Sequence, residues 1–324
     1  MQSKEVSYFI RSVDMQQLNP RALEYLNAVA KHGAIRKAAA RLNVDPSAIS
    51  RLLSQLEDNI GMPVWDRSNP QKPLTPAGEE LLRYFKTMQA SEAATMSRIH
   101  DLVGLRTGEV RVAVGEGFIS DLISFPLQSF LTAYPGIRIS VEMAGALDAV
   151  QMLEDSTIDF AITYAPARHP KLHCLAERHH PLDLITPVDH PLVQETPPLS
   201  FEHILNVPLA LIDSSTGMGR LVSFVEEVSH VRLEPRLRTN SVAVLKNFVT
   251  SGMGITFMPK LTVIDEIRSG KISVVPMEHQ ALSQARARVL CAEGRELTLA
   301  AQAFLDHLKH SMAFLKFDAN EVKC

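Results

Sequence analysis

Cysteine, tryptophan and long apolar runs are scarce in this chain of 324 residues. Its three cysteines, Cys174, Cys291 and Cys324, stand far apart, so the sequence shows neither a disulfide framework nor the close spacing of a zinc site. No apolar run approaches the roughly 20 residues that a membrane-spanning helix requires. The first residues also lack the basic, apolar and small-residue order of a secretory signal. We therefore expect a cytoplasmic protein with no membrane partner.

Signatures of catalysis are missing as well. The chain contains no Gly-x-Ser-x-Gly elbow, no His-Glu-x-x-His pair and no paired cysteine and histidine signature. Gly115 and Gly117 resemble the start of a dinucleotide-binding loop, but Ser120 stands where the third glycine belongs. Histidines concentrate between residues 169 and 190 without a fixed ligand spacing, which favours surface or hinge positions over a zinc site. We predict no catalytic residue, no metal, no cofactor and no enzymatic activity.

Charge is divided unevenly along the chain. The net charge is −3, yet the first 90 residues carry 12 lysines and arginines against 9 acidic residues. The remaining residues carry 21 against 27. A slightly basic N-terminal part on an acidic body is typical of a DNA-binding module attached to another domain. A chain of this length also has room for two or three domains.

Three helix starts near the N-terminus share one pattern. Asn19, Asp45 and Thr75 each precede a proline, so a capping side chain is followed by the residue best tolerated at the first helical position. The first helix is predicted over residues 20–32, with Gly33 as its C-terminal stop.

Two short amphipathic helices follow closely. Apolar residues recur at intervals of three and four from Ile35 to Leu42 and again from Ile49 to Leu56. Only residues 43–45 connect the two segments, so the helices must cross, which is the geometry of a helix-turn-helix. Periodicity alone leaves open a small bundle in which the second helix is merely solvated.

The outward face of the second helix carries hydroxyl, amide and guanidinium groups. At about 100° per residue, Ser47, Arg51 and Ser54 point away from the apolar side, with Ser50 and Gln55 on the flanks. In a major groove, arginine reads guanine and hydroxyls contact bases or phosphates. The face has no carboxylate before the helix end, which favours contact with DNA.

Residues 23–82 resemble the N-terminal domain of LysR-type transcription regulators. The resemblance rests on these residues in this order: Ala38, Ala39, Leu42, the run from Pro46 to Arg51, Leu56, Glu57, Gly61, Arg67 and the run from Leu74 to Gly78. An order and spacing this long are highly specific. The resemblance implies a recognition helix over residues 46–56 and a wing over residues 64–74. It therefore predicts an all-α winged helix-turn-helix domain over residues 15–74.

The resemblance also implies contacts outside the recognition helix. Arg67 and Lys72 of the wing would bind phosphates, and Arg36 adds a further phosphate contact where relatives often carry serine or threonine. Asp45 stands where relatives often carry glutamine, so a helix cap replaces a common base contact. The expected partner is double-stranded DNA with an interrupted palindrome.

Residues 75–107 predict one long helix with a narrow apolar seam, which includes Phe85, Met96 and Ile99. A seam of this kind is exposed on its own and requires a partner. The resemblance implies an antiparallel linker helix that pairs two subunits, and further a dimer of dimers, whereas the chain itself argues for at least a dimer. The alternative is a helix that packs on its own C-terminal domain.

Residues 108–324 alternate between strand-like and helix-like segments. Strands are predicted at residues 110–114, 137–143, 158–164, 184–187, 209–212, 236–239 and 255–258. Helices are predicted at residues 121–133, 147–155, 219–227, 242–251, 260–267 and 297–315. This alternation predicts parallel sheets covered by helices, and its two sets predict a two-lobed α/β domain resembling periplasmic binding proteins.

Ligands of open α/β sheets bind at the carboxyl ends of strands, so the loops there form the candidate effector site. LysR-type effector domains have similar loops in this order. Hydroxyls and backbone N–H groups at helix starts suit a small polar anion, although Glu116 and the lack of an arginine argue against one. The candidate effector-binding residues are Glu116, Gly117, Phe118, Ile119, Thr163, Tyr164, Ser214, Ser215, Thr216, Asn240 and Ser241.

Together these patterns predict a ligand-responsive, sequence-specific DNA-binding regulator of the LysR type. A small-molecule effector in the interlobe cleft would change lobe closure and thereby DNA binding or promoter activation. The alternative is a small-molecule-binding protein or enzyme that carries a helical N-terminus. Sequence-specific, salt-dependent binding to duplex DNA separates the two.

Overall fold

The computed structural model describes residues 18–66, 74–101, 107–167 and 169–317. The chain divides into two compact units, Met1–Ala90 and Ser91–Cys324. Among the described residues, no helix combines the length and the apolar character needed to cross a bilayer.

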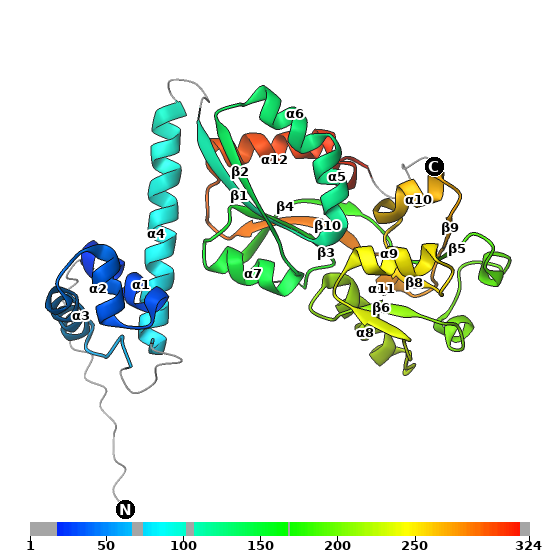
Figure 1. The fold of residues 1–324 in the computed structure, drawn as a ribbon, viewed down its shortest axis with the longest axis horizontal. Coiled ribbons are helices and arrows are strands. Elements are labelled where there is room, and N and C mark those ends of the chain that lie inside the picture. The colour runs from blue at the N-terminus through cyan, green and yellow to red at the C-terminus, as the bar shows by residue number, and fades with distance from the viewer. Residues whose placement is uncertain (1–17, 67–73, 102–106, 168, 318–324) are drawn as a thin grey trace, which may run out of the picture. The chain divides into compact units, whose positions relative to one another are not determined.

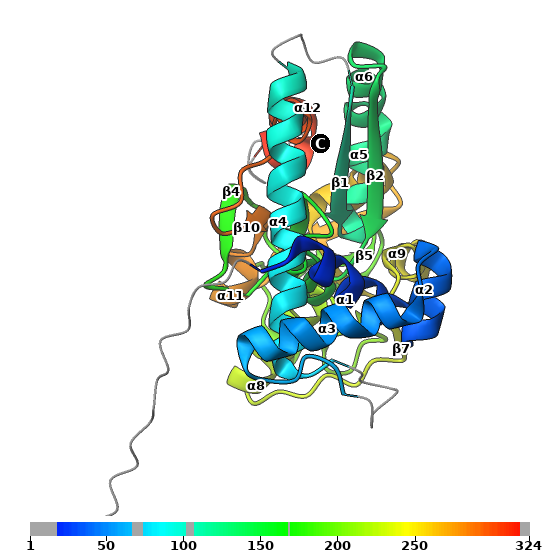
Figure 2. The same ribbon diagram turned by 90° about the vertical axis from the view of Figure 1, so that its left-hand side faces the viewer.

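Three helices and the first part of a fourth build the N-terminal unit (Figures 1 and 2). They are α1 (Pro20–His32), α2 (Ile35–Leu42), α3 (Pro46–Ile60) and α4 (Pro76–Asp101). All three predicted caps are present, since backbone N–H groups donate to Asn19 Oδ1 at 2.9 Å, Asp45 Oδ1 at 2.7 Å and Thr75 Oγ1 at 3.1 Å. Gly33 and Asn43 end α1 and α2 in the left-handed conformation, so the chain turns sharply into the next helix.

The core of this unit joins α4 to the helix-turn-helix. Leu23, Ile49 and Leu53 are buried together with Phe85 of α4, which is only 4% exposed. Phe85 therefore packs inside its own unit, whereas the sequence had placed it in the seam for a second subunit. Farther along α4, Met96 and Ile99 are exposed.

The wing begins and ends on contacts with α3 and α4. Trp65 forms an antiparallel bridge with Leu74, and the backbone N–H of Thr75 donates to Val64 O at 3.2 Å. A Cβ on Gly78 would lie 2.1 Å from Val64 O, so only glycine allows α4 to approach the wing this closely. Residues 67–73, the middle of the predicted wing, lie outside the described part of the chain.

The first lobe of the C-terminal unit is built on one mixed sheet. Its strand order is β2-β1-β3-β10-β4, formed by β1 (Gly108–Val114), β2 (Ile137–Met143), β3 (Phe160–Tyr164), β4 (Leu172–His179) and β10 (Arg286–Ala292). Strand β1 runs parallel to β2 and β3, but β10 runs antiparallel to β3 and β4. The expectation of a parallel sheet is thus correct for β1, β2 and β3, whereas β10 and β4, which the sequence does not predict as strands, extend the sheet by antiparallel pairing.

Helices cover both faces of this sheet (Figure 1). One face carries α6 (Pro126–Ala133) and α12 (Leu299–Ser311), and the other carries α7 (Ala146–Glu154). Alternation along β1 explains the two layers, because Val112 and Val114 face α6 and α12 while Ala113 faces α7.

Two predicted helices of this lobe are each divided in two. The segment 121–133 forms α5 (Ile119–Ser124) and α6, with the break at Phe125 before Pro126. The segment 297–315 forms α12 and α13 (Ala313–Lys316). The side chain of Asp121 accepts hydrogen bonds from the backbone of Ala313 and Phe314, so α5 and α13 meet at these breaks.

The second lobe lies between β4 and β10 in the sequence. Its strands are β5 (Asp183–Pro187), β6 (Ala210–Ile212), β7 (Leu237–Thr239), β8 (Thr256–Met258) and β9 (Ile272–Val275). Its helices are α8 (Gly217–Val228), α9 (Val242–Thr250), α10 (Ile264–Arg268) and α11 (Gln280–Ser283). Strand β5 pairs antiparallel with β8 and β9, and β6 pairs parallel with β7. The parallel prediction is therefore wrong for the centre of this lobe.

Two adjacent segments connect the lobes. The backbone N–H of His180 donates to Ala285 O at 3.0 Å, and that of Leu182 donates to Leu282 O at 3.0 Å. The outgoing and returning connections between the lobes are thus hydrogen-bonded to each other.

Candidate functional site

The apolar and polar sides of α3 separate as the sequence predicts. Ile49, Leu53 and Leu56 are at most 4% exposed. On the opposite side, Ser47, Arg51, Ser54 and Gln55 are exposed, and Ser50 is partly buried. Arg36 is exposed in the first turn of α2, whereas Arg67 and Lys72 lie outside the described residues.

The start of α3 is held by an acidic cap. Asp45 Oδ1 accepts a hydrogen bond from the backbone N–H of Ser47. Hydrogen bonding by the side chain and the backbone of Ser47 lowers the pKa of Asp45 from its ordinary value. The carboxylate is therefore ionised at neutral pH and is engaged by its own helix.

The end of α3 is tied to the wing by a second carboxylate. Glu57 Oε1 accepts hydrogen bonds from the backbone N–H groups of Val64 at 2.9 Å and Trp65 at 3.3 Å. Since Val64 is fully buried, these bonds fix the direction in which the chain leaves the helix. The polar face of α3 and the first residues of the wing are thus held in a fixed orientation to each other.

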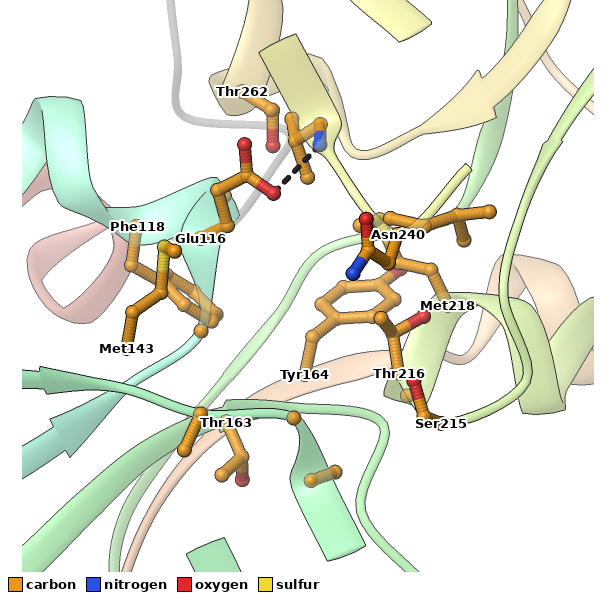
Figure 3. A pocket seen from close by; sticks show the side chains of 18 of the residues that line it. Glu116, Phe118, Met143, Thr163, Tyr164, Ser215, Thr216, Met218, Asn240 and Thr262 are labelled. Atoms are coloured by element: carbon orange, nitrogen blue, oxygen red, sulfur yellow. Dashed lines mark hydrogen bonds between the residues drawn. The ribbon is translucent and has the colours of Figure 1, made fainter. Parts of the chain in front are cut away.

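A cavity of about 250 Å³ lies between the two lobes of the C-terminal unit (Figure 3). The lobes approach closely at its walls: a Cβ on Gly145 would lie 2.8 Å from Ser215 O, and a Cβ on Gly217 would lie 1.7 Å from Tyr164 O. Glycine at both positions therefore lets backbone from one lobe touch the other.

The structure brings most of the predicted effector residues to this cavity. Those that line it are Glu116, Gly117, Phe118, Thr163, Tyr164, Ser215, Thr216 and Asn240. Ile119, Ser214 and Ser241 do not line it, although each is next in sequence to a residue that does. Ser241 instead caps α9, where its hydroxyl accepts a bond from the backbone N–H of Val244.

Glu116 spans the two lobes. It follows β1 in the first lobe, and its carboxylate accepts three hydrogen bonds from the start of α9 in the second. The donors are Ser241 Oγ at 2.9 Å, the backbone N–H of Val242 at 2.7 Å and the backbone N–H of Ala243 at 3.2 Å. The dashed line in Figure 3 marks a hydrogen bond of this carboxylate.

Both halves of the chain match known domains. Residues 104–313 match the LysR substrate binding domain, and residues 20–79 match the bacterial regulatory helix-turn-helix protein of the lysR family. The chain belongs to the LysR family. It is a transcriptional regulator with a helix-turn-helix DNA-binding domain and an effector-binding domain, which confirms the predicted fold and function.

The similarity between this LysR protein and known regulators extends over most of the length of both chains. The transcriptional activator CmpR of Synechocystis sp. is 26% identical over 288 residues, which cover 88% of this chain and 93% of CmpR. The transcriptional regulator CbbR of Sinorhizobium medicae is 26% identical over 265 residues, covering 81% and 83% of the two chains. These relatives are regulators and not enzymes.

Solved LysR structures share the fold. A full-length OxyR variant from Pseudomonas aeruginosa has a TM-score of 0.66 at 17% identity, covering 92% of this chain and 95% of OxyR. Full-length CbnR in complex with its target DNA has a TM-score of 0.56 at 19% identity, covering 90% of this chain and 99% of CbnR.

Sequence reasoning missed part of the cleft of this LysR regulator. Thr262 follows β8, so the rule that ligands bind beyond strand ends could have found it. Met143 ends β2 and is 67% exposed at the cavity wall, whereas Phe314 arrives from the C-terminal helices. Nothing local in the sequence places Phe314 there, because its position depends on the packing of α13.

The charged side chains of the described cavity wall are acidic. Glu116 and Asp148 line it, and none of the lining residues is a lysine, arginine or histidine. The rest of the wall is largely apolar or neutral, with Tyr164 donating its hydroxyl to His180 O at 2.7 Å. In the part of the chain that is described, no group of three histidine, cysteine or acidic side chains is placed to hold a metal ion.

Proposed function

We propose that this LysR regulator reads its operator through the polar face of α3. The observation that carries this proposal is the sharp division of that helix, whose apolar residues are buried while Ser47, Arg51, Ser54 and Gln55 are exposed. An exposed guanidinium among hydroxyls and an amide matches the donors and acceptors of a major groove. Ser50 belongs to the same face.

Phosphate contacts would position this face on the duplex. Arg36 is exposed in α2, the helix that precedes α3, and Arg67 and Lys72 of the wing would add two more contacts. The DNA-binding domain then comprises residues 15–74, the linker residues 75–107 and the effector domain residues 108–324.

The interlobe cavity is the effector site in this proposal. Its volume suits a small organic molecule, and its wall combines apolar side chains with a few polar groups, as ligand pockets do. Binding there changes the population of closed and open lobe arrangements, which couples the effector to DNA binding in the cytoplasm.

The protein is further proposed to act as at least a dimer, and at full assembly as a dimer of dimers, on an interrupted palindrome. Exposed Met96 and Ile99 on α4 supply an apolar surface for the partner helix. Replacing Ile99 by glutamate is expected to shift the protein toward the monomer in sedimentation velocity, and unchanged sedimentation would contradict the role of α4.

The experiment that tests the function is selection of genomic fragments by the purified full-length protein at about 150 mM salt. Recovery of a few fragments that share an interrupted palindrome is the expected result, with affinity that falls steeply as salt rises. Uniform recovery by a folded protein, with and without a panel of metabolites, would overturn the proposal.

A further inference from the structure

The start of α9 is already occupied by a carboxylate from the other lobe. Glu116 accepts hydrogen bonds from the backbone N–H groups of Val242 and Ala243 and from Ser241 Oγ, at 2.7 to 3.2 Å. The two lobes contribute one side each to this contact, and the residues involved are separated by 125 to 127 positions in the sequence.

Helix geometry explains why a carboxylate belongs there. The first N–H groups of a helix have no partner within it, and the helix dipole places partial positive charge at that end. Bonds from such donors to an ionised carboxylate are short and stronger than bonds between neutral groups. Glu116 therefore does for α9 what a bound anion would do, but it is attached to the opposite lobe.

This contact forms part of the cavity wall. Glu116, Asn240 and Val242 all line the cavity, so a small anion entering it would meet an anchor that is already filled. The other charged residue of the described wall is Asp148, which would repel a second anion. We propose that Glu116 is a built-in carboxylate ligand of the cleft, which ties α9 to the first lobe and closes the start of that helix to an anionic effector.

The inference rests on the proposed function only in treating this cavity as the effector site. It also limits the expectation that hydroxyls and helix starts in these loops bind a small anion, because at the start of α9 the protein supplies that anion itself. Its test needs neither DNA nor an effector, so failure here would leave the reading of DNA by α3 untouched.

Amide hydrogen exchange on the full-length protein tests the proposal directly. In Glu116→Ala, the peptide containing Val242 and Ala243 is expected to exchange about tenfold faster than in the wild type. Exchange should also rise in the facing cavity segments, near Gly117 and Ser215, because the lobes lose their tie. A change confined to the start of α9 would mean that Glu116 only caps this helix, and it would contradict the proposed tie between the lobes.

Rescue by acetate is the decisive test, since acetate carries the carboxylate group that the substitution removes. Added acetate is expected to restore protection at Val242 and Ala243 in Glu116→Ala, while sodium chloride of equal ionic strength does not. The wild type should not respond to acetate, because its anchor is filled. An equal response of the wild type, or no rescue of a variant whose circular dichroism is unchanged, would contradict the proposal.

Two further variants control the experiment. Glu142→Ala removes an exposed carboxylate from β2 in the same lobe, so it should leave the exchange of α9 unchanged. Glu116→Gln keeps the side-chain size but loses the charge, and it should show an intermediate rate without acetate rescue. If Glu142→Ala accelerates exchange as much as Glu116→Ala, the effect comes from charge in general and the proposal fails.

Discussion

The polar face of α3 comes from one continuous helix, whereas the wall of the cleft is drawn from loops, strand ends and helices spread between Gly115 and Phe314. On α3 most of the proposed DNA-contacting side chains are exposed, whereas in the cleft Glu116 is hydrogen-bonded to the opposite lobe. A surface that must meet DNA can be specified by local periodicity and left open. A surface that must enclose a small molecule depends on long-range packing, and its polar groups are partly satisfied within the protein.

The largest expected effect tests whether the two units are stable independently. Phe304 is fully buried in the first lobe, with its ring centroid 4.8 Å from that of Phe130. Phe304→Ala should cost about 3–5 kcal/mol of unfolding free energy, because it removes aromatic contacts and leaves a cavity. In calorimetry we expect the transition of the effector domain to shift while that of the DNA-binding unit stays in place.

The matched variant is Leu53→Ala, which removes a 4% exposed side chain from the core of the DNA-binding unit at a cost of about 2–5 kcal/mol. It should shift only the other transition. If either variant moves both transitions together, the contrast between two separately stable regions is wrong.

The second effect concerns pH and the lobe that holds α9. Burial raises the pKa of Asp183 to about 6, against the opposing influence of Lys260 and His179. The unfolded chain loses this proton near its ordinary value of 3.8, so the folded state holds more protons between these values. Stability from this group is therefore fully present below about pH 4 and is lost as pH rises through 6. Asp183→Asn should stabilise the effector domain above pH 6 by at most about 3 kcal/mol.

Urea denaturation from pH 4 to pH 8 checks this prediction. The difference between variant and wild type should grow with pH and then level off. Asp189→Asn replaces an exposed carboxylate in the same lobe and should give a difference that does not change over this range. A flat difference for Asp183→Asn would contradict the raised pKa of this carboxyl.

Most of the DNA-binding unit could be predicted from the sequence, because its helix bounds and caps depend on local sequence patterns. The spacing of Pro20 and Gly33 gave the bounds of α1, and the caps at Asp45 and Thr75 lie where they were predicted. Burial of Phe85 was missed, since an apolar position on a long helix does not say which neighbour covers it.

The cleft was only partly legible because its geometry is assembled across the chain. The strand-end rule identified loops such as those at Thr163 and Ser215. It could not show that Glu116 binds the start of α9, since the partners are more than a hundred residues apart. Strands β4 and β10 were also missed. They pair with each other across the whole second lobe, and local sequence patterns do not predict pairing between such distant segments.

The third effect isolates base reading on α3. Arg51→Ala should lose about 1–3 kcal/mol of specific DNA binding and relax the preference at one base position. The reason is that an exposed guanidinium in the middle of the polar face is placed to pair with a base edge. Fluorescence anisotropy with the selected operator and with single-base variants measures both quantities.

Arg83→Ala is the control for Arg51, since Arg83 is an arginine of the same unit that pairs with Glu80 on α4. It should leave the base preference intact. If Arg51→Ala weakens binding to all sequences equally, this side chain contacts a phosphate and the assignment of base reading moves to its neighbours.

The smallest effect concerns Glu57, whose carboxylate accepts backbone hydrogen bonds at the end of α3, as that of Glu116 does in the cleft. One oxygen of this carboxylate accepts bonds from Val64 and Trp65 and so fixes the start of the wing. Glu57→Gln keeps an acceptor oxygen but loses the charge, so we expect a cost of about 1 kcal/mol in the unfolding of this unit. Asp58→Asn, at the exposed neighbouring position, should cost less. DNA affinity should fall in Glu57→Gln without a change of base preference, because in the proposed function the wing positions the protein and α3 reads the sequence. A changed preference would mean that the wing entry also sets the angle of α3 in the groove, and the division between the two would no longer hold.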